Sequence, residues 1–156
     1  MPTRTHVLLD LDGTLSASAP GITRSLRAAL LAEGLAAPSE VELEHVVGPP
    51  FEHVLPLLGV PADRIWAVID RYRERYERVG VYETEPFEGV EAMLDQLATA
   101  GLTLAIATSK PEPTARTVVD HFAWTSRFAV VAGATYEPGR RTKADVIAHA
   151  LGQLDV

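Results

Sequence analysis

Two aspartates separated by a single residue carry the strongest chemical signal in the sequence. Asp10 and Asp12 follow an apolar run, Val7–Leu9, and precede Gly13. Side chains two positions apart point to the same side of a strand, so the two carboxylates converge at the strand's carboxyl end. Open α/β sheets bind their ligands at this end. Neighbouring carboxylates repel each other, and a divalent cation together with a phosphoryl group would relieve that repulsion.

A calcium-binding EF-hand loop also begins with Asp-x-Asp, but the rest of such a loop does not match. The EF-hand requires glycine at its sixth position and glutamate at its twelfth, where this chain has Leu15 and Gly21. A chance Asp-x-Asp pair in a surface turn rarely ends so apolar a run. The pair therefore favours a catalytic carboxylate site, at which Gly13 turns the chain out of the sheet.

Three apolar runs predict the strands that would carry this site. They are His6–Asp12, Leu102–Thr108 and Phe128–Ala134. Nearly continuous apolar strands are typical of a parallel sheet covered on both faces. Segments with helical patterns follow the second and third strands, at about Pro113–Phe122 and Thr142–Leu154. Strands that alternate with helices predict an α/β fold with an open, right-handed, Rossmann-like parallel sheet.

About ninety residues separate the first two strands, and their patterns are helical. Four or five helices fit there, at Pro20–Leu31, Ser39–Gly48, Phe51–Leu58, Asp63–Arg78 and Glu88–Ala100. Ser39 and Glu42 form a capping-box pattern, and Pro56 is expected to bend the third of these helices. We therefore expect an α/β core of residues 1–15 and 85–156, interrupted by a helical insert of residues 16–84.

The composition is that of a folded, acidic protein. Apolar residues make up 47% and charged residues 22% of the 156 residues, and 21 acidic against 14 basic side chains give a net charge of −7. An acidic chain lacks the cationic excess that binds nucleic-acid phosphates. The absence of cysteine excludes disulfides, thiolate zinc sites and cysteine nucleophiles. No apolar segment approaches the ~20 residues of a membrane span, so a cytoplasmic location is expected.

The motif Asp10-Leu-Asp-Gly-Thr14 resembles the first motif of the haloacid dehalogenase-like superfamily. Similar segments follow in the superfamily's order, so that the resemblance covers essentially the whole chain. These segments are Ser18-Ala-Pro-Gly-Ile22, Val47-Gly-Pro-Pro-Phe51, Tyr72-Arg73, Pro86-Phe-Glu-Gly-Val90, Ala107-Thr-Ser-Lys-Pro111 and Lys143-Ala-Asp-Val-Ile147. Within the superfamily, the chain is similar to phosphoglycolate phosphatases and bacterial 5′-nucleotidase-like enzymes. The resemblance implies that residues 16–84 form the helical cap of such an enzyme.

The resemblance also implies a reaction, the Mg²⁺-dependent hydrolysis of a small phosphorylated metabolite such as phosphoglycolate or a nucleoside monophosphate. Asp10 would attack phosphorus and form an aspartyl-phosphate. Asp12 would protonate the departing oxygen and then accept a proton from the water that hydrolyses the intermediate. Both aspartates would be metal ligands for Mg²⁺, which is the expected cofactor.

Four further residues are implied to bind phosphate. Thr108 matches the superfamily's second motif, where its hydroxyl and the following N–H, that of Ser109, would donate to a phosphoryl oxygen. Lys143 matches the third motif, and a lysine at a helix N-terminus is unfavourable unless it shares an anion with the helix. Arg140 matches an arginine of close relatives and is a candidate contact for the substrate phosphate. The signal for Lys110 is weaker.

The superfamily's fourth motif, with one or two acidic residues after a fourth strand, has no counterpart up to residue 156. The chain is therefore expected to be truncated before that core strand, with the remaining acidic metal ligand beyond residue 156. In the superfamily's order the fourth strand pairs beside the first. Without it, the strand His6–Asp12 is expected to form an exposed edge of the sheet.

Two alternatives to hydrolysis stay open from the sequence. The aspartyl-phosphate could pass its phosphoryl group to an acceptor other than water, which would make the protein a phosphotransferase. A chain that truly ends at residue 156 could instead be a non-catalytic binding module. For either enzyme the expected partner is a small-molecule phosphomonoester, with no nucleic acid and no membrane, and the protein is expected to be a monomer or homodimer.

Overall fold

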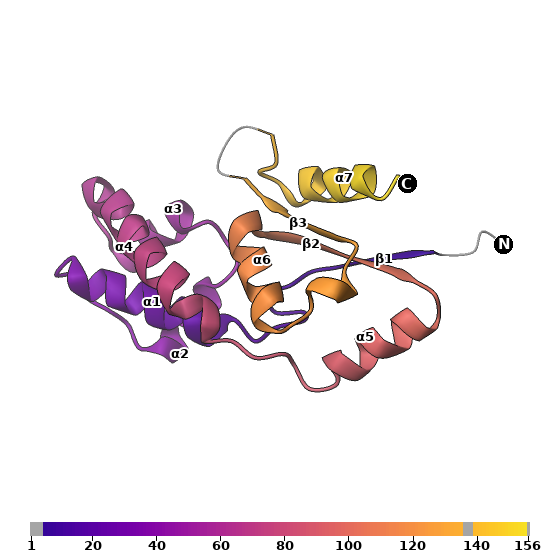
Figure 1. The fold of residues 1–156 in the computed structure, drawn as a ribbon. Helices are drawn as coiled ribbons and strands as arrows, with labels where there is room; N and C mark the ends of the chain where they lie inside the picture. The colour runs from indigo at the N-terminus through magenta and orange to yellow at the C-terminus, as the bar shows by residue number, and fades with distance from the viewer. Residues whose placement is uncertain (1–4, 136–138, 156) are drawn as a thin grey trace. The chain divides into compact units, whose positions relative to one another are not determined.

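The computed structural model describes residues 5–135 and 139–155, and the chain divides into two compact units. The core unit joins the segments Met1–Ala17 and Glu85–Val156, and the helical unit is the continuous segment Ser18–Thr84 (Figure 1). All three strands belong to the core unit. The long segment between the first and second strands thus contains a unit of its own.

The core unit is built on three parallel strands in the order β1-β2-β3. They are β1 (His6–Leu9), β2 (Thr103–Pro111) and β3 (Val130–Ala134). Leu9 of β1 pairs with Ile106 of β2, and the register of β2 with β3 shifts between Ala107 and Pro111. The prediction of an α/β fold with an open parallel sheet is confirmed.

Helices cover the sheet on both faces. One face carries α7 (Lys143–Gln153), and the other carries α5 (Val90–Thr99) and α6 (Glu112–His121) (Figure 1). Small side chains on one face of the sheet, Ala105 and Ala132 among them, pack against Val146 and Ala150 of α7. A parallel sheet whose apolar side chains face both ways needs this double cover to remove them from water.

β1 lies at an edge of the sheet in the described part of the chain, because it pairs with β2 alone. Its four residues are half-buried, whereas most of β2 is buried. The strand ends at Leu9, before the expected end at Asp12. It stops there because the chain turns at Leu11, whose carbonyl oxygen accepts hydrogen bonds from the N–H groups of Leu15 and Ser16.

The helical unit contains two long helices and two short ones. They are α1 (Ala19–Ala32), α2 (Glu40–Leu43), α3 (Phe51–Val54) and α4 (Ile65–Arg78). Short 3₁₀ turns lie at Glu44–Val46, Leu55–Leu58, Ala62–Arg64 and Gly80–Tyr82, and in the core unit at Thr125–Arg127. Leu26, Leu30, Leu55 and Val68 form the centre of the helical unit's apolar core. None of the helices within the described residues is long and apolar enough to cross a membrane.

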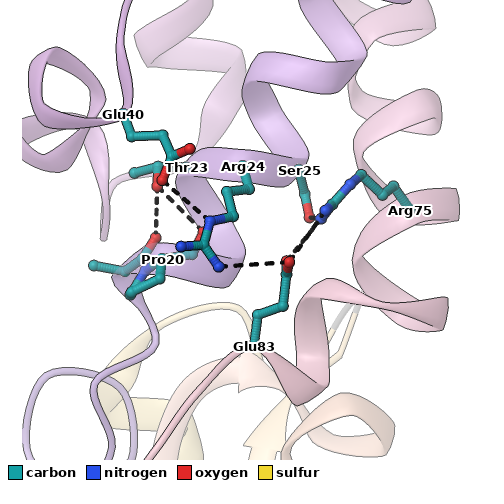
Figure 2. A network of polar contacts seen from close by, with 8 residues as sticks. Pro20, Thr23, Arg24, Ser25, Glu40, Arg75 and Glu83 are labelled. Carbon is teal, nitrogen blue, oxygen red and sulfur yellow. Dashed lines mark hydrogen bonds and ion pairs between the residues drawn. The ribbon is translucent and has the colours of Figure 1, made fainter.

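A polar cluster joins α1, α4 and the segment after α4 within the helical unit (Figure 2). Arg75 donates to both carboxylate oxygens of Glu83, at 2.9 and 3.3 Å, and to Ser25 Oγ at 2.7 Å. Arg24 Nη1 lies 3.6 Å from Glu83 Oε1. The hydrogen bond from Arg75 holds the pKa of the Glu83 carboxyl below its usual value, although burial acts in the opposite direction.

We expect Glu83→Gln to reduce the stability of the protein at neutral pH by about 1 to 2 kcal/mol, because it removes the charge-assisted bonds from Arg75. The pKa of Glu83 is lower in the folded than in the unfolded protein, so the unfolded chain takes up more protons as the pH falls. The native protein should therefore lose stability below about pH 4.5 more steeply than the variant.

Urea unfolding followed by circular dichroism between about pH 3 and pH 7 measures this difference. Glu77→Gln, an exposed position on α4, is the matched control and should change stability by less than about 0.5 kcal/mol. If the free energy of unfolding fell equally steeply with decreasing pH in the native protein and in Glu83→Gln, the stabilising role of the Arg75 pairing would be contradicted.

Candidate active site

Asp10 directly follows β1 and is held at both carboxylate oxygens. Oδ1 accepts a hydrogen bond from the N–H of Leu11 at 2.8 Å, and Oδ2 lies 2.6 Å from Lys143 Nζ. This second contact is an ion pair without the angles of a hydrogen bond, and Nζ itself is shielded from water. Lys143 is the first residue of α7, whose start is fixed by a capping box between Thr142 and Asp145. The helix cap thus determines where the ammonium group lies.

Asp12 lies in the turn that follows the strand. Gly13 makes this turn with a φ of 73°, a left-handed conformation that glycine adopts without strain. Asp12 Oδ2 accepts a hydrogen bond from Lys110 Nζ at 2.8 Å, and only 4% of the Lys110 side chain is exposed. Asp12 Oδ1 is shielded from water and has no hydrogen-bond partner among the described residues. Such an atom marks a position at which a ligand can supply the missing contact.

Thr108 and Ser109 lie near the carboxyl end of β2. Thr108 is 1% exposed, and its Oγ1 accepts a hydrogen bond from the N–H of Lys110 at 3.2 Å. Because Oγ1 acts there as the acceptor, the hydroxyl proton is left for a different acceptor, such as a phosphoryl oxygen. Ser109 is exposed. The Thr108 hydroxyl therefore adjoins the residue that binds Asp12.

Arg140 pairs with Glu112, the first residue of α6, and with neither aspartate in the described part of the chain. Arg140 Nη1 lies 2.7 Å from Glu112 Oε2, and Glu112 also accepts from Arg116 at 3.0 Å and from the N–H of Gly133 at 3.3 Å. Burial alone would raise the pKa of Glu112, but these hydrogen bonds and the Arg140 charge hold it below its usual value. The network joins α6, β3 and the segment before α7.

The charges of the two ion pairs balance. Asp10 and Asp12 each face one lysine, Lys143 and Lys110 respectively, in a chain whose net charge is −7. This local balance weakens the repulsion that an acidic protein exerts on an anionic substrate. No group of three His, Cys, Asp or Glu side chains that could hold a metal occurs within residues 5–135 and 139–155. The oxygen donors of the two aspartates do fit a hard cation such as Mg²⁺.

The sequence indicated Lys110 less strongly than Lys143 and did not single out Glu112. A signal for Lys110 was nevertheless present, because it lies two residues after Thr108 at the end of an apolar run. A lysine in such a place is buried only beside an anionic partner. Glu112 offered no comparable signal, since a glutamate in the first turn of a helix is common.

Comparison with known sequences yields one family and several enzymes. A family model described as haloacid dehalogenase-like hydrolase matches residues 7–156. The chain is 43% identical over 148 residues to the tyrosine-protein kinase PtkA of Mycobacterium tuberculosis, which covers 95% of this chain and 50% of the kinase. It is 38% identical over 147 residues to a 5′-nucleotidase of Pseudomonas aeruginosa, covering 94% of this chain and 66% of that protein. A phosphoglycolate phosphatase of Xylella fastidiosa is 39% identical over 129 residues, covering 81% of this chain and 56% of that protein.

Solved structures show the same architecture. A haloacid dehalogenase-like family protein of Streptococcus pneumoniae superposes with a TM-score of 0.90 at 28% identity, over 98% of this chain and 71% of that one. Protein tyrosine kinase A of Mycobacterium tuberculosis gives a TM-score of 0.85 at 40% identity, over the same shares of the two chains. This chain thus spans about half the length of the kinase sequence and about 70% of these solved chains.

Proposed function

This chain belongs to the haloacid dehalogenase-like hydrolases, and on that premise we propose that it hydrolyses small phosphomonoesters through an aspartyl-phosphate. The observation that carries the proposal is the pairing of Asp10 with Lys143 and of Asp12 with Lys110 after a parallel strand. The similar proteins named 5′-nucleotidase and phosphoglycolate phosphatase support this reaction class. Phosphoglycolate and nucleoside monophosphates are the proposed type of substrate.

In the first step Asp10 attacks phosphorus in line, the bond to the leaving oxygen breaks, and the carboxylate becomes an acyl phosphate. The Leu11 N–H and the Lys143 ammonium hold the Asp10 carboxylate before the substrate arrives, which lowers the entropic cost of aligning the nucleophile. Lys143 and the Thr108 hydroxyl are proposed to stabilise the negative charge on the phosphoryl oxygens that do not react.

Asp12 moves the protons in both steps. Asp12 is a carboxylate in its pair with Lys110, so it takes up a proton from solvent as the substrate binds and donates that proton to the departing oxygen, which leaves as an alcohol. It next accepts a proton from a water molecule, whose oxygen attacks phosphorus and breaks the bond to Asp10. Inorganic phosphate is released, Asp12 returns its proton to solvent, and both carboxylates are restored, so one residue serves as acid and then as base.

Oxygen atoms of Asp10 and Asp12 are proposed to hold Mg²⁺. When bound, the ion supplies positive charge that reduces the repulsion between the carboxylates and the phosphoryl oxygens. The two lysines already neutralise the two aspartates, so a phosphate dianion would leave the site with a net charge of −2 without the ion. This charge balance favours a divalent cation over a monovalent one.

We expect phosphate release from p-nitrophenyl phosphate to depend on magnesium. Chelation by EDTA should lower the rate at least about 10²-fold, because the uncompensated charge opposes attack, and added Mg²⁺ should restore the rate. A control at equal ionic strength with Na⁺ separates specific binding from screening. A rate that is unchanged by chelation would contradict the proposed metal dependence.

The helical unit, which falls within the expected cap at residues 16–84, is proposed to choose the leaving group. The chain enters this unit shortly after Asp12, at Ser18, and leaves it at Thr84. Caps of this kind exclude water and contact the part of the substrate that departs. Exchanging residues 18–84 for those of a relative should therefore change which phosphomonoesters are hydrolysed, as measured with a substrate panel.

Phosphotransfer is the second candidate, and one observation favours it. The chain is 43% identical to a protein named as a tyrosine-protein kinase. In such a reaction the same aspartyl-phosphate would be attacked by a hydroxyl group of another molecule in place of water. A labelled phosphoryl group distinguishes the two, because hydrolysis places the label in inorganic phosphate and transfer places it in the acceptor.

A further inference from the structure

We propose that Lys110 is a positioning residue for Asp12, and that it fixes the orientation in which the Asp12 carboxyl group exchanges a proton with the substrate. This inference rests on the proposed function and extends it to a residue whose sequence signal was weak. Lys110 Nζ lies 2.8 Å from Asp12 Oδ2, across 98 positions of the chain. Only 4% of the lysine side chain is exposed.

The backbone of Lys110 is held in place and its side chain is buried, so it can hold another group in place. Lys110 is part of β2, and its backbone N–H donates to Thr108 Oγ1 at 3.2 Å. Its carbonyl oxygen lies so close to Gly133 of the neighbouring strand that a Cβ there would be 2.7 Å away. A buried ammonium group is retained only beside an anion, and Asp12 provides that anion.

The pairing makes the two oxygens of Asp12 unequal. Oδ2 accepts a hydrogen bond from the Lys110 ammonium group, which is a hydrogen-bond donor only. Oδ1 is shielded from water and has no partner among the described residues. Lys110 therefore fixes the orientation of the Asp12 carboxyl group, which has to be defined for the acid in the first step and for the base in the second.

The leaving group provides the test of this role. An alkoxide departs poorly without a proton, whereas p-nitrophenolate is stable enough to depart with little help. The ratio kcat/KM reports only the steps up to the formation of the aspartyl-phosphate, in which Asp12 acts as the acid. A residue that positions the acid should therefore affect an alkyl phosphate far more than p-nitrophenyl phosphate.

Lys110→Met is expected to lower kcat/KM about 10²-fold for ethyl phosphate and less than about 5-fold for p-nitrophenyl phosphate. Asp12→Asn should show the same bias, and the double variant should lose no more than Asp12→Asn alone, because both changes remove one function. Lys110→Arg keeps the charge but shifts the donor, so it should show a smaller loss with the same bias. Thermal unfolding of each variant confirms that the protein is folded.

Lys143→Met is the matched control, because Lys143 is the other lysine of the sequence and faces Asp10. It should lower kcat/KM for the two substrates by similar factors. Equal losses on both substrates in Lys110→Met, or in Lys110→Arg should the methionine variant not fold, would overturn the positioning role alone. A native protein inactive on both substrates would overturn the proposed function and this inference with it.

Discussion

Asp10→Asn should abolish turnover, with kcat reduced at least about 10⁴-fold. The amide nearly matches the carboxylate in shape and can still accept the hydrogen bond from Leu11, so the turn after β1 should persist. It has no anionic oxygen, however, and cannot form the acyl phosphate. Phosphate release from p-nitrophenyl phosphate measures the loss, and trapping with hydroxylamine detects the intermediate in the native protein.

Asp120→Asn is the matched control for this substitution. Asp120 lies on α6 of the same unit, where its carboxylate accepts a hydrogen bond from Thr125. It should retain the native rate within about 2-fold, because surface substitutions away from a site rarely affect function. Unchanged phosphatase activity in Asp10→Asn would refute the assignment of Asp10 as the nucleophile.

Gly133→Ala should destabilise the core unit by at least about 3 kcal/mol and lower activity as well. A Cβ at this position would lie 2.5 Å from Glu112 Cα, 2.6 Å from Glu112 N and 2.7 Å from Lys110 O. These are backbone atoms, so no side-chain rotation can relieve the overlap. Either β3 or the junction between β2 and α6 must move, and that junction positions Thr108 and Lys110.

Gly152→Ala provides the control for the general effect of replacing glycine. Gly152 lies in α7, and a Cβ there meets no atom within 4 Å. Alanine should raise stability by up to about 1 kcal/mol there, since glycine is a poor helix former. Urea unfolding followed by circular dichroism compares the two variants. A Gly133→Ala protein as stable as the native one would contradict the close approach of β3 to Glu112.

The strands could be located from the sequence because their apolar runs are nearly continuous, but the ends of the first two could not. β2 extends to Pro111, three residues past its expected end at Thr108, because Pro111 pairs with Ala134 of β3 after a shift in register. A lysine is expected at the surface until its anionic neighbour is known. The pairing of Lys110 with Asp12, 98 positions away, could therefore not be predicted from local patterns.

The positions of the short helices were predicted from the sequence, but their division into α-helix and 3₁₀ turn was not. The capping box of Ser39 with Glu42 is confirmed, yet the expected helix Ser39–Gly48 divides into α2 and a 3₁₀ turn. The expected bend at Pro56 is a change from α-helix to 3₁₀ turn at Leu55. Apolar spacing over one or two turns does not distinguish these helix types, because their periods differ by only about half a residue.

The candidate site was predictable as a set of residue types but not as a set of pairs. The positions of Asp10 and Lys143 at element ends follow from local patterns, such as an apolar run or a helix cap. The identity of each partner depends on how distant segments pack. The pairing of Arg140 with Glu112 is an example, since the two residues are 28 positions apart and neither has a local signal for the other.

The pairing of β1 with β2 has a consequence for how the chain folds during synthesis. Leu9 and Ile106 are neighbours in the sheet although about 100 residues separate them along the chain. At a ribosomal rate of ~5–20 residues per second, the first strand waits roughly 5 to 20 s for its partner. If the inserted helices fold during that wait, the effective loop shortens and its closure costs less entropy. The order of folding would then run from the middle of the chain outward, with the nascent N-terminus joining its sheet late.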